Sequence, residues 1–423
     1  MLTQDQTNLL TQTGPGTAGG SLLRAYWQPI ALSEELPPGG APLPVLVMSE
    51  ELVLFRDEQG NPGLLGLHCP HRGADLSYGR LEDGGLRCIY HGWLYDVTGR
   101  CLEQPGEPAG STFHERIKHT AYPCHEVAGL IFAYLGEGER PQFPAYEFLH
   151  APEAHIHVAR VFHECNYLQA NEGNIDPVHL SYLHLLRQGV AANAEMEGLN
   201  SLIAGDIAPA IELEETDFGI RICTIRDAGP DECYARITNY IYPNLSAFSA
   251  AIPDGYSVNW HVPASDTTHW KYMINFSRGN PVDRGLMDRL FFGDQLTPDR
   301  RFKRNKANRY LQDRDEMQAR SFIGLGGNFV LHDTLATEGQ GPVQDRGQEH
   351  LSSSDKTIVL ERTLLQRAIQ QMQATGKAPH VIRDPAANHL EHVGAMELRL
   401  PKSADWRRAV ADRVEEARGA VRV

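Results

Sequence analysis

Two short segments of the chain each carry one cysteine and one histidine. The first segment holds Cys69 and His71, and sixteen residues later the second holds Cys88 and His91. Two thiolates and two imidazoles can bind a tetrahedral zinc ion, or a [2Fe-2S] cluster in which the cysteines bind one iron and the histidines the other. Zinc fingers commonly group both cysteines and then both histidines, whereas the order here alternates. The alternation therefore favours the iron-sulfur cluster.

A second group of candidate ligands follows further along the chain. His179 and His184 lie in an apolar, helix-like stretch, and Asp176 precedes the first of them by three residues. A spacing of five puts the two histidines about 140° apart on a regular helix, so shared ligation requires a helix end or a wider turn. Asp176 can accept the second ring N–H of His179 and so fix its tautomer. Two histidines and one carboxylate on Fe(II) leave positions open for O2, as in non-heme iron oxygenases.

Composition excludes several other classes of protein. The chain has 423 residues, a formal net charge of -15 and seven cysteines. This charge argues against a nucleic-acid partner, because phosphate binding requires clustered Lys and Arg. No apolar run approaches the ~20 residues that span a bilayer, and the polar start does not fit a secretory signal. We therefore expect a cytoplasmic protein without membrane contact, in which the five cysteines outside the two segments are structural.

The elements that must position these residues divide into an all-β part and an α+β part. Short apolar runs separated by Gly, Pro and acidic turns fill residues 45–137 and predict small antiparallel sheets. A Pro-rich segment at 140–152 leads to the second part. There we expect helix-like stretches and strand-like runs, with helices at 164–187, 284–318, 356–375 and 403–419 and strands at 219–226, 233–242, 256–263 and 269–277. This order predicts an antiparallel sheet with helices around it.

Residues 69–76 and 88–93 closely resemble the Rieske motif of aromatic ring-hydroxylating oxygenases. Over most of its length the chain is similar to α-subunits of the phthalate dioxygenase branch. The resemblance implies that Cys69, His71, Cys88 and His91 hold a [2Fe-2S] Rieske cluster. It also implies a mononuclear Fe(II) site with the ligands His179, His184 and Asp333. Asp176 matches the carboxylate that links the cluster of one subunit to the iron of the next.

Asp333 is selected by the resemblance, because Asp333 and Glu338 match the Asp and Glu that the family carries five residues apart. Other aspartates lie in polar contexts and are weaker candidates, namely Asp313, Asp315, Asp345 and Asp355. The family fold implies three parts in an α+β protein. These are an N-terminal arm (1–44), an all-β Rieske domain (45–150) and a catalytic helix-grip domain (151–423) that combines an antiparallel sheet with helices.

The implied activity is hydroxylation of an aromatic acid with O2, by cis-dihydroxylation or by O-demethylation. Family members are homo-oligomers, commonly trimers. The chain lacks a G-x-G-x-x-G fingerprint after a strand, so NAD(P)H must deliver its electrons through a separate reductase that carries flavin and iron-sulfur groups. Residues 188–220 contain no Lys or Arg, which makes the dicarboxylate phthalate a poor substrate.

Arg221, Arg226 and Arg236 follow on strand-like runs, and each would most commonly be a surface or ion-paired arginine. We take Arg236 as the candidate contact for a substrate carboxylate. Two other functions stay open, a Rieske electron carrier and a zinc-stabilised protein that binds an aromatic ligand without oxygenase chemistry. The content of iron and acid-labile sulfide distinguishes all three.

Overall fold

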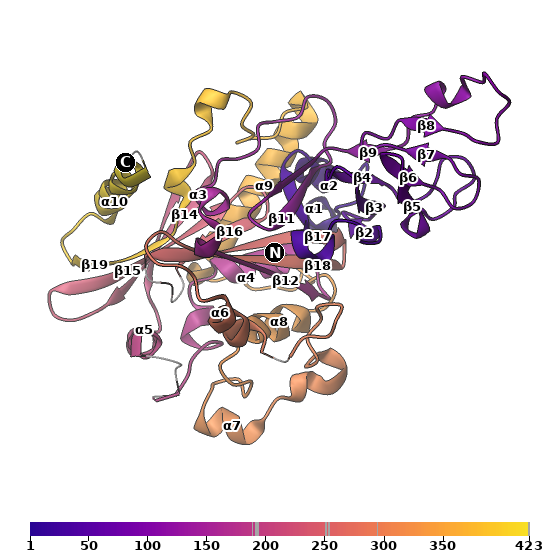
Figure 1. The fold of residues 1–423 in the computed structure, drawn as a ribbon. Coiled ribbons are helices and arrows are strands. Elements are labelled where there is room, and N and C mark those ends of the chain that lie inside the picture. Colours follow the sequence, from indigo (N-terminus) through magenta and orange to yellow (C-terminus); the bar gives the residue numbers. More distant parts are fainter. Residues whose placement is uncertain (188, 191–193, 250–251, 253, 294, 422–423) are drawn as a thin grey trace.

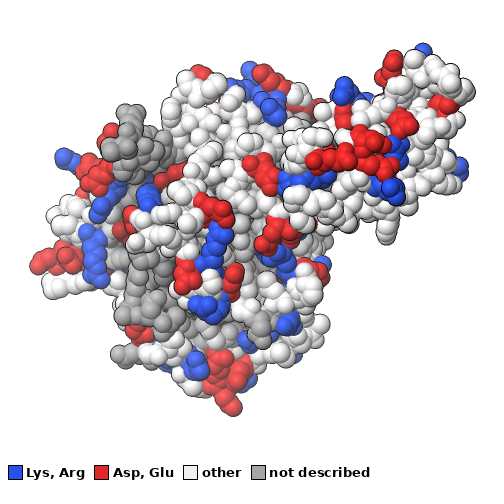
Figure 2. Space-filling model, viewed as in Figure 1, with Lys and Arg blue, Asp and Glu red and all other residues white. Residues whose placement is uncertain are grey.

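The computed structural model describes residues 1–187, 189, 190, 194–249, 252, 254–293 and 295–421. A small all-β unit projects from a larger unit that is built on one broad sheet (Figure 1). Among the described residues, no helix combines the length and the apolar character needed to cross a membrane. On the face that Figure 2 shows, basic side chains are scattered among acidic ones and do not gather into one patch.

The N-terminal unit consists of three antiparallel sheets, in the strand orders β1-β11-β10, β2-β3-β4-β9 and β5-β6-β7-β8. Their strands are β1 (Trp27–Leu32), β2 (Leu43–Val47), β3 (Glu50–Arg56), β4 (Pro62–Gly66), β5 (Arg80–Glu82), β6 (Gly85–Arg87), β7 (Leu94–Tyr95), β8 (Cys101–Glu103), β9 (Ala121–Tyr122), β10 (Cys124–Val127) and β11 (Leu130–Tyr134). β1 lies within the predicted N-terminal arm and pairs with β11 along its length. This part of the arm therefore completes a sheet of the β unit.

A small separate core lies under the two cysteine-histidine segments. Val53, Phe55, Leu65 and Leu86 are fully buried in it, and Cys69 and Cys88 belong to the same cluster. Apolar side chains thus surround both thiols. A buried anionic sulfur would be costly here without a metal, because burial disfavours the charged form.

The larger unit is built on an eight-stranded antiparallel sheet in the order β12-β18-β17-β16-β15-β14-β13, with β19 paired to β15. Its strands are β12 (Ile156–His163), β13 (Ala210–Glu215), β14 (Gly219–Asp227), β15 (Glu232–Ile241), β16 (Leu245–Phe248), β17 (Gly255–Ser265), β18 (Thr268–Ser277) and β19 (Met396–Pro401). β14, β15, β17 and β18 coincide with the four predicted strand-like runs. The predicted α+β class is confirmed.

Ten α-helices are described, and most of them surround this sheet (Figure 1). Their bounds are α1 (Gln4–Thr11), α2 (Ala18–Arg24), α3 (Glu147–His150), α4 (Tyr167–Ile175), α5 (Ala194–Gly205), α6 (Arg284–Phe291), α7 (Arg314–Ala319), α8 (Phe329–Gly339), α9 (Lys356–Thr375) and α10 (Trp406–Val421). α4 contacts β17, α8 and α9, so it lies between the sheet and two other helices. The helices that we expected at 356–375 and near 403–419 are α9 and α10.

Two predicted helices are shorter than the sequence pattern indicated. The helix expected at 164–187 is only α4, because Pro177 disfavours helical backbone at Asp176, which is extended. The helix expected at 284–318 is interrupted after α6 by Gly293, which has a φ of 55°, and by Pro298, so that α7 begins only at residue 314. The first of these breaks lies directly before His179.

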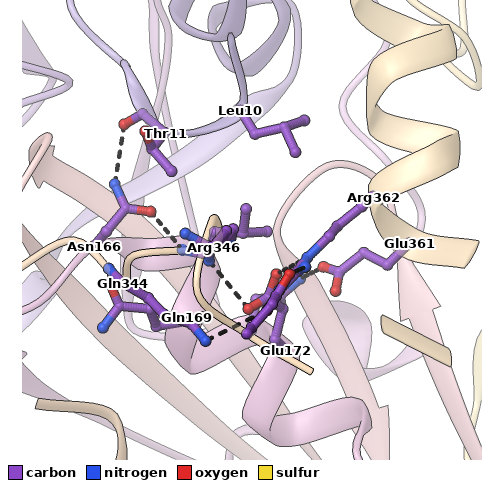
Figure 3. A network of polar contacts seen from close by, with 12 residues as sticks. Leu10, Thr11, Asn166, Gln169, Glu172, Gln344, Arg346, Glu361 and Arg362 are labelled. Carbon is purple, nitrogen blue, oxygen red and sulfur yellow. Dashed lines mark hydrogen bonds and ion pairs between the residues drawn. The ribbon is translucent and has the colours of Figure 1, made fainter. Parts of the chain in front are cut away.

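A buried network of charged side chains fixes α4 to α9 and to the loop around residue 346 (Figure 3). Glu172 on α4 accepts hydrogen bonds from Arg346 (3.0 Å) and Arg362 (2.6 Å). Glu361 on α9 accepts a hydrogen bond from Asn171 at 2.6 Å. Burial and the nearby Glu172 raise the pKa of Glu361 well above its usual range, so Glu361 is neutral while Glu172 is ionised. Because α4 leads directly into the His179 segment, this network also fixes where that segment begins.

Replacing Glu172 with Gln is expected to lower the free energy of unfolding by about 3 to 5 kcal/mol, because Arg346 and Arg362 lose a buried ionised partner. Glu361→Gln is the matched control in the same network. It replaces a carboxyl group that is already neutral in the folded protein, so at pH 6 it should not lower the free energy of unfolding. Thermal melts followed by circular dichroism measure both variants.

The same pair predicts a pH dependence. A carboxyl whose pKa is raised by folding stabilises the fold at low pH and loses that stabilisation as the pH rises through its folded pKa. Glu361→Gln should therefore melt higher than the unmodified chain in alkaline buffer. Equal destabilisation by the two substitutions at pH 6 would contradict the assignment of the charge to Glu172.

Candidate functional site

Two loops with the same backbone geometry hold the cysteine-histidine segments. In each loop the cysteine N–H donates to the carbonyl five residues later, at 2.8 Å in both. The carbonyl of Cys69 accepts from the N–H of Gly73 (2.8 Å), as that of Cys88 does from Gly92 (3.0 Å). Both glycines have positive φ, 73° and 74°, a conformation that glycine adopts without steric cost. The matched turns bring two equivalent pairs of side chains together.

The four side chains of these loops suit a two-iron cluster. Cys69 and Cys88 are buried, and burial and the neighbouring Cys88 raise the pKa of the Cys69 thiol. The rings of His71 and His91 lie further out, with centroids 4.4 Å apart. Nδ1 of His71 is buried without a hydrogen-bond partner. A buried ring nitrogen with no partner is expected where a metal binds it.

Aromatic side chains enclose this group of ligands. Trp93 stacks on His71 at a centroid distance of 4.4 Å, whereas Tyr90 is more than half exposed and lies against His91. Sequence reasoning missed Tyr95, which is fully buried with its hydroxyl 3.2 Å from Sγ of Cys69. Strand alternation puts residue 95 on the same face as residue 93, and this signal could have identified it.

His179, His184 and Asp333 form a second group. Each offers one ligand atom, and the three atoms lie within 4.8 Å of one another. His179 begins a 3₁₀ turn at residues 179–181, His184 follows in the next turn, and Asp333 lies in the second turn of α8. The break after α4 therefore supplies the helix end that the spacing of the two histidines requires. Nε2 of His184 is 2.9 Å from Oδ1 of Asp333, so both atoms face the same point.

Hydrogen bonds fix the orientation of both histidines. Nδ1 of His179 donates to the backbone carbonyl of Asp176 at 2.5 Å. The prediction that the Asp176 side chain accepts this N–H was wrong, because the turn at Pro177 directs the carboxylate to the N–H of Val178 instead (2.8 Å). Asp176 is partly exposed. Nε2 of His179 remains free for a metal.

His332, which sequence reasoning missed, orients His184. Its Nε2 donates to the carbonyl of Gly326 (3.0 Å), so its Nδ1 is left to accept from Nδ1 of His184 (3.2 Å). Burial lowers the pKa of His332 to about 3, which keeps the ring neutral and able to accept. Nε2 of His184 therefore carries the lone pair that a metal needs.

Asp333 is the ionised member of the group. Burial alone would raise its pKa, but His184 and Lys271 hold the pKa of the Asp333 carboxyl well below its usual range. Nζ of Lys271 lies 3.3 Å from Oδ2 of Asp333. Two imidazoles and one carboxylate are a donor set that fits Fe(II).

A largely apolar cavity of about 200 Å³ opens beside the three ligands. Arg236 forms part of its wall, and the buried guanidinium donates to the carbonyl of Ser249 (2.6 Å), while its Nε has no hydrogen-bond partner in the described part of the chain. The other two candidate arginines have different surroundings. Arg221 pairs with Glu214, and Arg226 donates to the carbonyl of Pro177 and to Ser181. Of the three, Arg236 is the one that lines the cavity.

Comparisons with known proteins agree with this arrangement. Residues 26–121 match the family model of the Rieske [2Fe-2S] domain, and residues 133–422 match the model described as LigXa C-terminal domain like. The oxygenase subunit of phthalate 4,5-dioxygenase from Pseudomonas putida is 36% identical, over 96% of this chain and 94% of that protein. The oxygenase subunit of 5,5'-dehydrodivanillate O-demethylase from Sphingobium sp. is 30% identical, over 92% and 85%.

A solved structure shares the fold. The crystal structure of dicamba monooxygenase bound to dicamba superposes with a TM-score of 0.59 at 19% identity, and covers 84% of this chain and 99% of that one. Family models match both units of the chain, and relatives at 30% identity or more match nearly its whole length. The chain belongs to the Rieske non-heme iron aromatic ring-hydroxylating oxygenases and is the oxygenase component, or α-subunit, of a multicomponent enzyme.

Proposed function

We propose that this oxygenase component hydroxylates an aromatic acid with a single ring. The observation that carries the proposal is the cavity beside His179, His184 and Asp333, with a buried guanidinium in its wall. A cavity of 150 Å³ holds benzene, so about 200 Å³ suits one substituted ring. Because no acidic partner of Arg236 lies among the described residues, this arginine is a suitable contact for the substrate carboxylate.

We propose that the two groups of ligands bind two different redox centres. Cys69, His71, Cys88 and His91 hold the Rieske cluster, and His179, His184 and Asp333 hold Fe(II). When bound, the cluster supplies electrons singly and the ferrous ion activates O2. The surrounding side chains direct Nε2 of His179 and His184 to one point and hold Asp333 ionised. The apolar wall excludes water from the substrate.

We propose that electrons pass between subunits of a homo-oligomer, with a trimer as the expected state. Figure 1 supports this, because β5–β8 lie at one end of the molecule, far from α8 and α4. The partly exposed Asp176 at the end of α4 is the proposed link to the cluster of the neighbouring subunit. In this proposal the chain divides near residue 150. The Rieske domain (45–150), which follows the N-terminal arm (1–44), receives the electrons, and the catalytic domain (151–423) carries out the reaction.

The electron donor that we propose is a reductase with flavin and iron-sulfur groups that oxidises NAD(P)H. We place the activity in the cytoplasm, in the breakdown of aromatic compounds. None of the seven cysteines, all of which the structure describes, forms a disulfide, as expected in a reducing compartment.

Relatives of this chain are named both as dioxygenases and as an O-demethylase, so the reaction outcome must be measured. The experiment incubates the iron-loaded protein with a surrogate reductase, NADH and paired methoxylated and unmethoxylated benzoates in air. Formaldehyde with the matching phenol indicates O-demethylation, and a cis-diol indicates dihydroxylation. If neither forms while other substrate classes are oxidised, the proposal of an aromatic acid is wrong.

Arg236→Met is expected to raise KM for a carboxylate substrate by about 10- to 100-fold, the value of one charge-assisted hydrogen bond. The KM for the corresponding primary amide should change little, because the amide carries no charge. Arg221→Met is the matched control, since Arg221 lies on the same sheet but pairs with Glu214. Equal effects of Arg236→Met on acid and amide would contradict the assignment.

His332→Phe is expected to weaken Fe(II) binding by about 10- to 100-fold while the cluster absorbance stays unchanged. Phe fills the buried space but cannot accept the N–H of His184. His332→Gln keeps an acceptor and a donor and should recover part of the affinity. Anaerobic competition with a chelator measures all three proteins, and full affinity in His332→Phe would show that the hydrogen bond does not position His184.

A further inference from the structure

Lys271 is a buried cation beside the proposed metal ligands. It lies on β18, in register with Val161 of β12 and His261 of β17, so strands on both sides fix its backbone. Its side chain is 2% exposed. Among the described residues, the carboxylate within ion-pair distance is that of Asp333, at 3.3 Å from Nζ.

Three buried histidines near Lys271 are neutral. His163, His261 and His269 lie near it on the same sheet face, and burial lowers the pKa of all three, that of His269 to about 4. Among the described residues, Asp333 is therefore the charged partner that pairs with Lys271.

The two carboxylate oxygens of Asp333 face different partners. Oδ1 lies 2.9 Å from Nε2 of His184, on the side where the three ligand atoms converge. Oδ2 faces Nζ of Lys271. A carboxylate that gives both oxygens to a metal occupies two coordination positions, whereas one that gives a single oxygen occupies one.

We propose that Lys271 keeps Asp333 a one-oxygen ligand by holding its second oxygen away from the metal, and so preserves an open coordination position at the cavity. The proposal rests on the proposed Fe(II) site. A role in stability alone explains the arrangement poorly. With Fe(II) bound, Asp333 already has a cationic partner, and a second cation nearby weakens metal binding by repulsion. The presence of Lys271 is explained if one-oxygen coordination by Asp333 matters more for function than a high affinity for Fe(II).

The test compares wild type with Lys271→Met, which has a similar length but no charge and no donor. We expect Lys271→Met to bind Fe(II) more tightly, on the order of tenfold, because repulsion is removed and a second oxygen becomes available. The crystal structure of the Fe(II)-loaded variant should show both oxygens of Asp333 on the metal. The absorbance of the cluster verifies that the variant is folded. If Lys271→Met cannot be produced as a folded protein, Lys271→Leu is used in its place.

Lys271→Gln separates the hydrogen bond from the charge. Gln keeps a donor toward Oδ2, so Asp333 should remain a one-oxygen ligand in this variant. Unchanged or weaker Fe(II) binding in Lys271→Met, or one-oxygen ligation in its crystal structure, would overturn the proposal. So would two-oxygen ligation in Lys271→Gln. A wild-type chain that holds the cluster but no Fe(II) at His179, His184 and Asp333 would overturn the proposed function itself, which distinguishes the two failures.

Discussion

Asp176→Asn is expected to reduce turnover by on the order of a hundredfold or more while the cluster and the mononuclear iron stay bound. The substitution keeps the size of the side chain and an oxygen that can accept the N–H of Val178. It replaces the other carboxylate oxygen with a donor, so the side chain can no longer accept an N–H on both sides. The proposed link from the neighbouring cluster therefore fails.

The measurement is the rate at which the reduced cluster is reoxidised when substrate and O2 are added, together with the iron content. Asp313→Asn is a matched control, because Asp313 likewise accepts the backbone N–H two residues later and caps α7 away from the ligands. Reoxidation near the native rate in Asp176→Asn would show that electrons do not pass through this carboxylate.

Asp333→Asn is expected to remove the mononuclear iron and leave the Rieske cluster intact. The amide fills the same space and its oxygen can still accept from Lys271, so the fold should be retained. A neutral amide is a much weaker ligand for Fe(II) than a carboxylate. Replacing a residue that only hydrogen-bonds to a metal ligand typically lowers metal affinity by about 10- to 100-fold, and we expect a larger loss here. Turnover should fall to background.

The loss should appear as about one iron fewer per chain with unchanged sulfide. Asp345→Asn serves as control, because Asp345 accepts the backbone N–H of Gly347 in a loop. Full iron content in Asp333→Asn would mean that another carboxylate completes the site.

The sequence predicted those features that short spacings determine. The turns around Cys69 and Cys88 repeat because each cysteine is followed at a fixed distance by a glycine with positive φ. Four of the eight strands of the large sheet, β14, β15, β17 and β18, were predictable because their apolar runs are long. Among the competing aspartates, Asp313 and Asp355 cap helices, a local role that polar sequence contexts indicated.

The sequence could not predict contacts between side chains from distant elements. Lys271 contacts Asp333 because β18 and α8 pack together. The separation of the two residues in the sequence gives no indication of that contact. His332 adjoins Asp333 in the chain, but its partner His184 lies 148 residues away. The hydrogen bond from His179 to the carbonyl of Asp176 could not be predicted either, because every residue has a backbone carbonyl and the sequence does not show which one accepts.

The most direct test of this account is the content of iron and acid-labile sulfide in the anaerobically loaded protein. One chain that holds both a Rieske cluster and a mononuclear ferrous ion should contain about three iron and about two sulfide. A content of about two iron and two sulfide would make the chain an electron carrier, and zinc without sulfide would contradict both proposed metal sites.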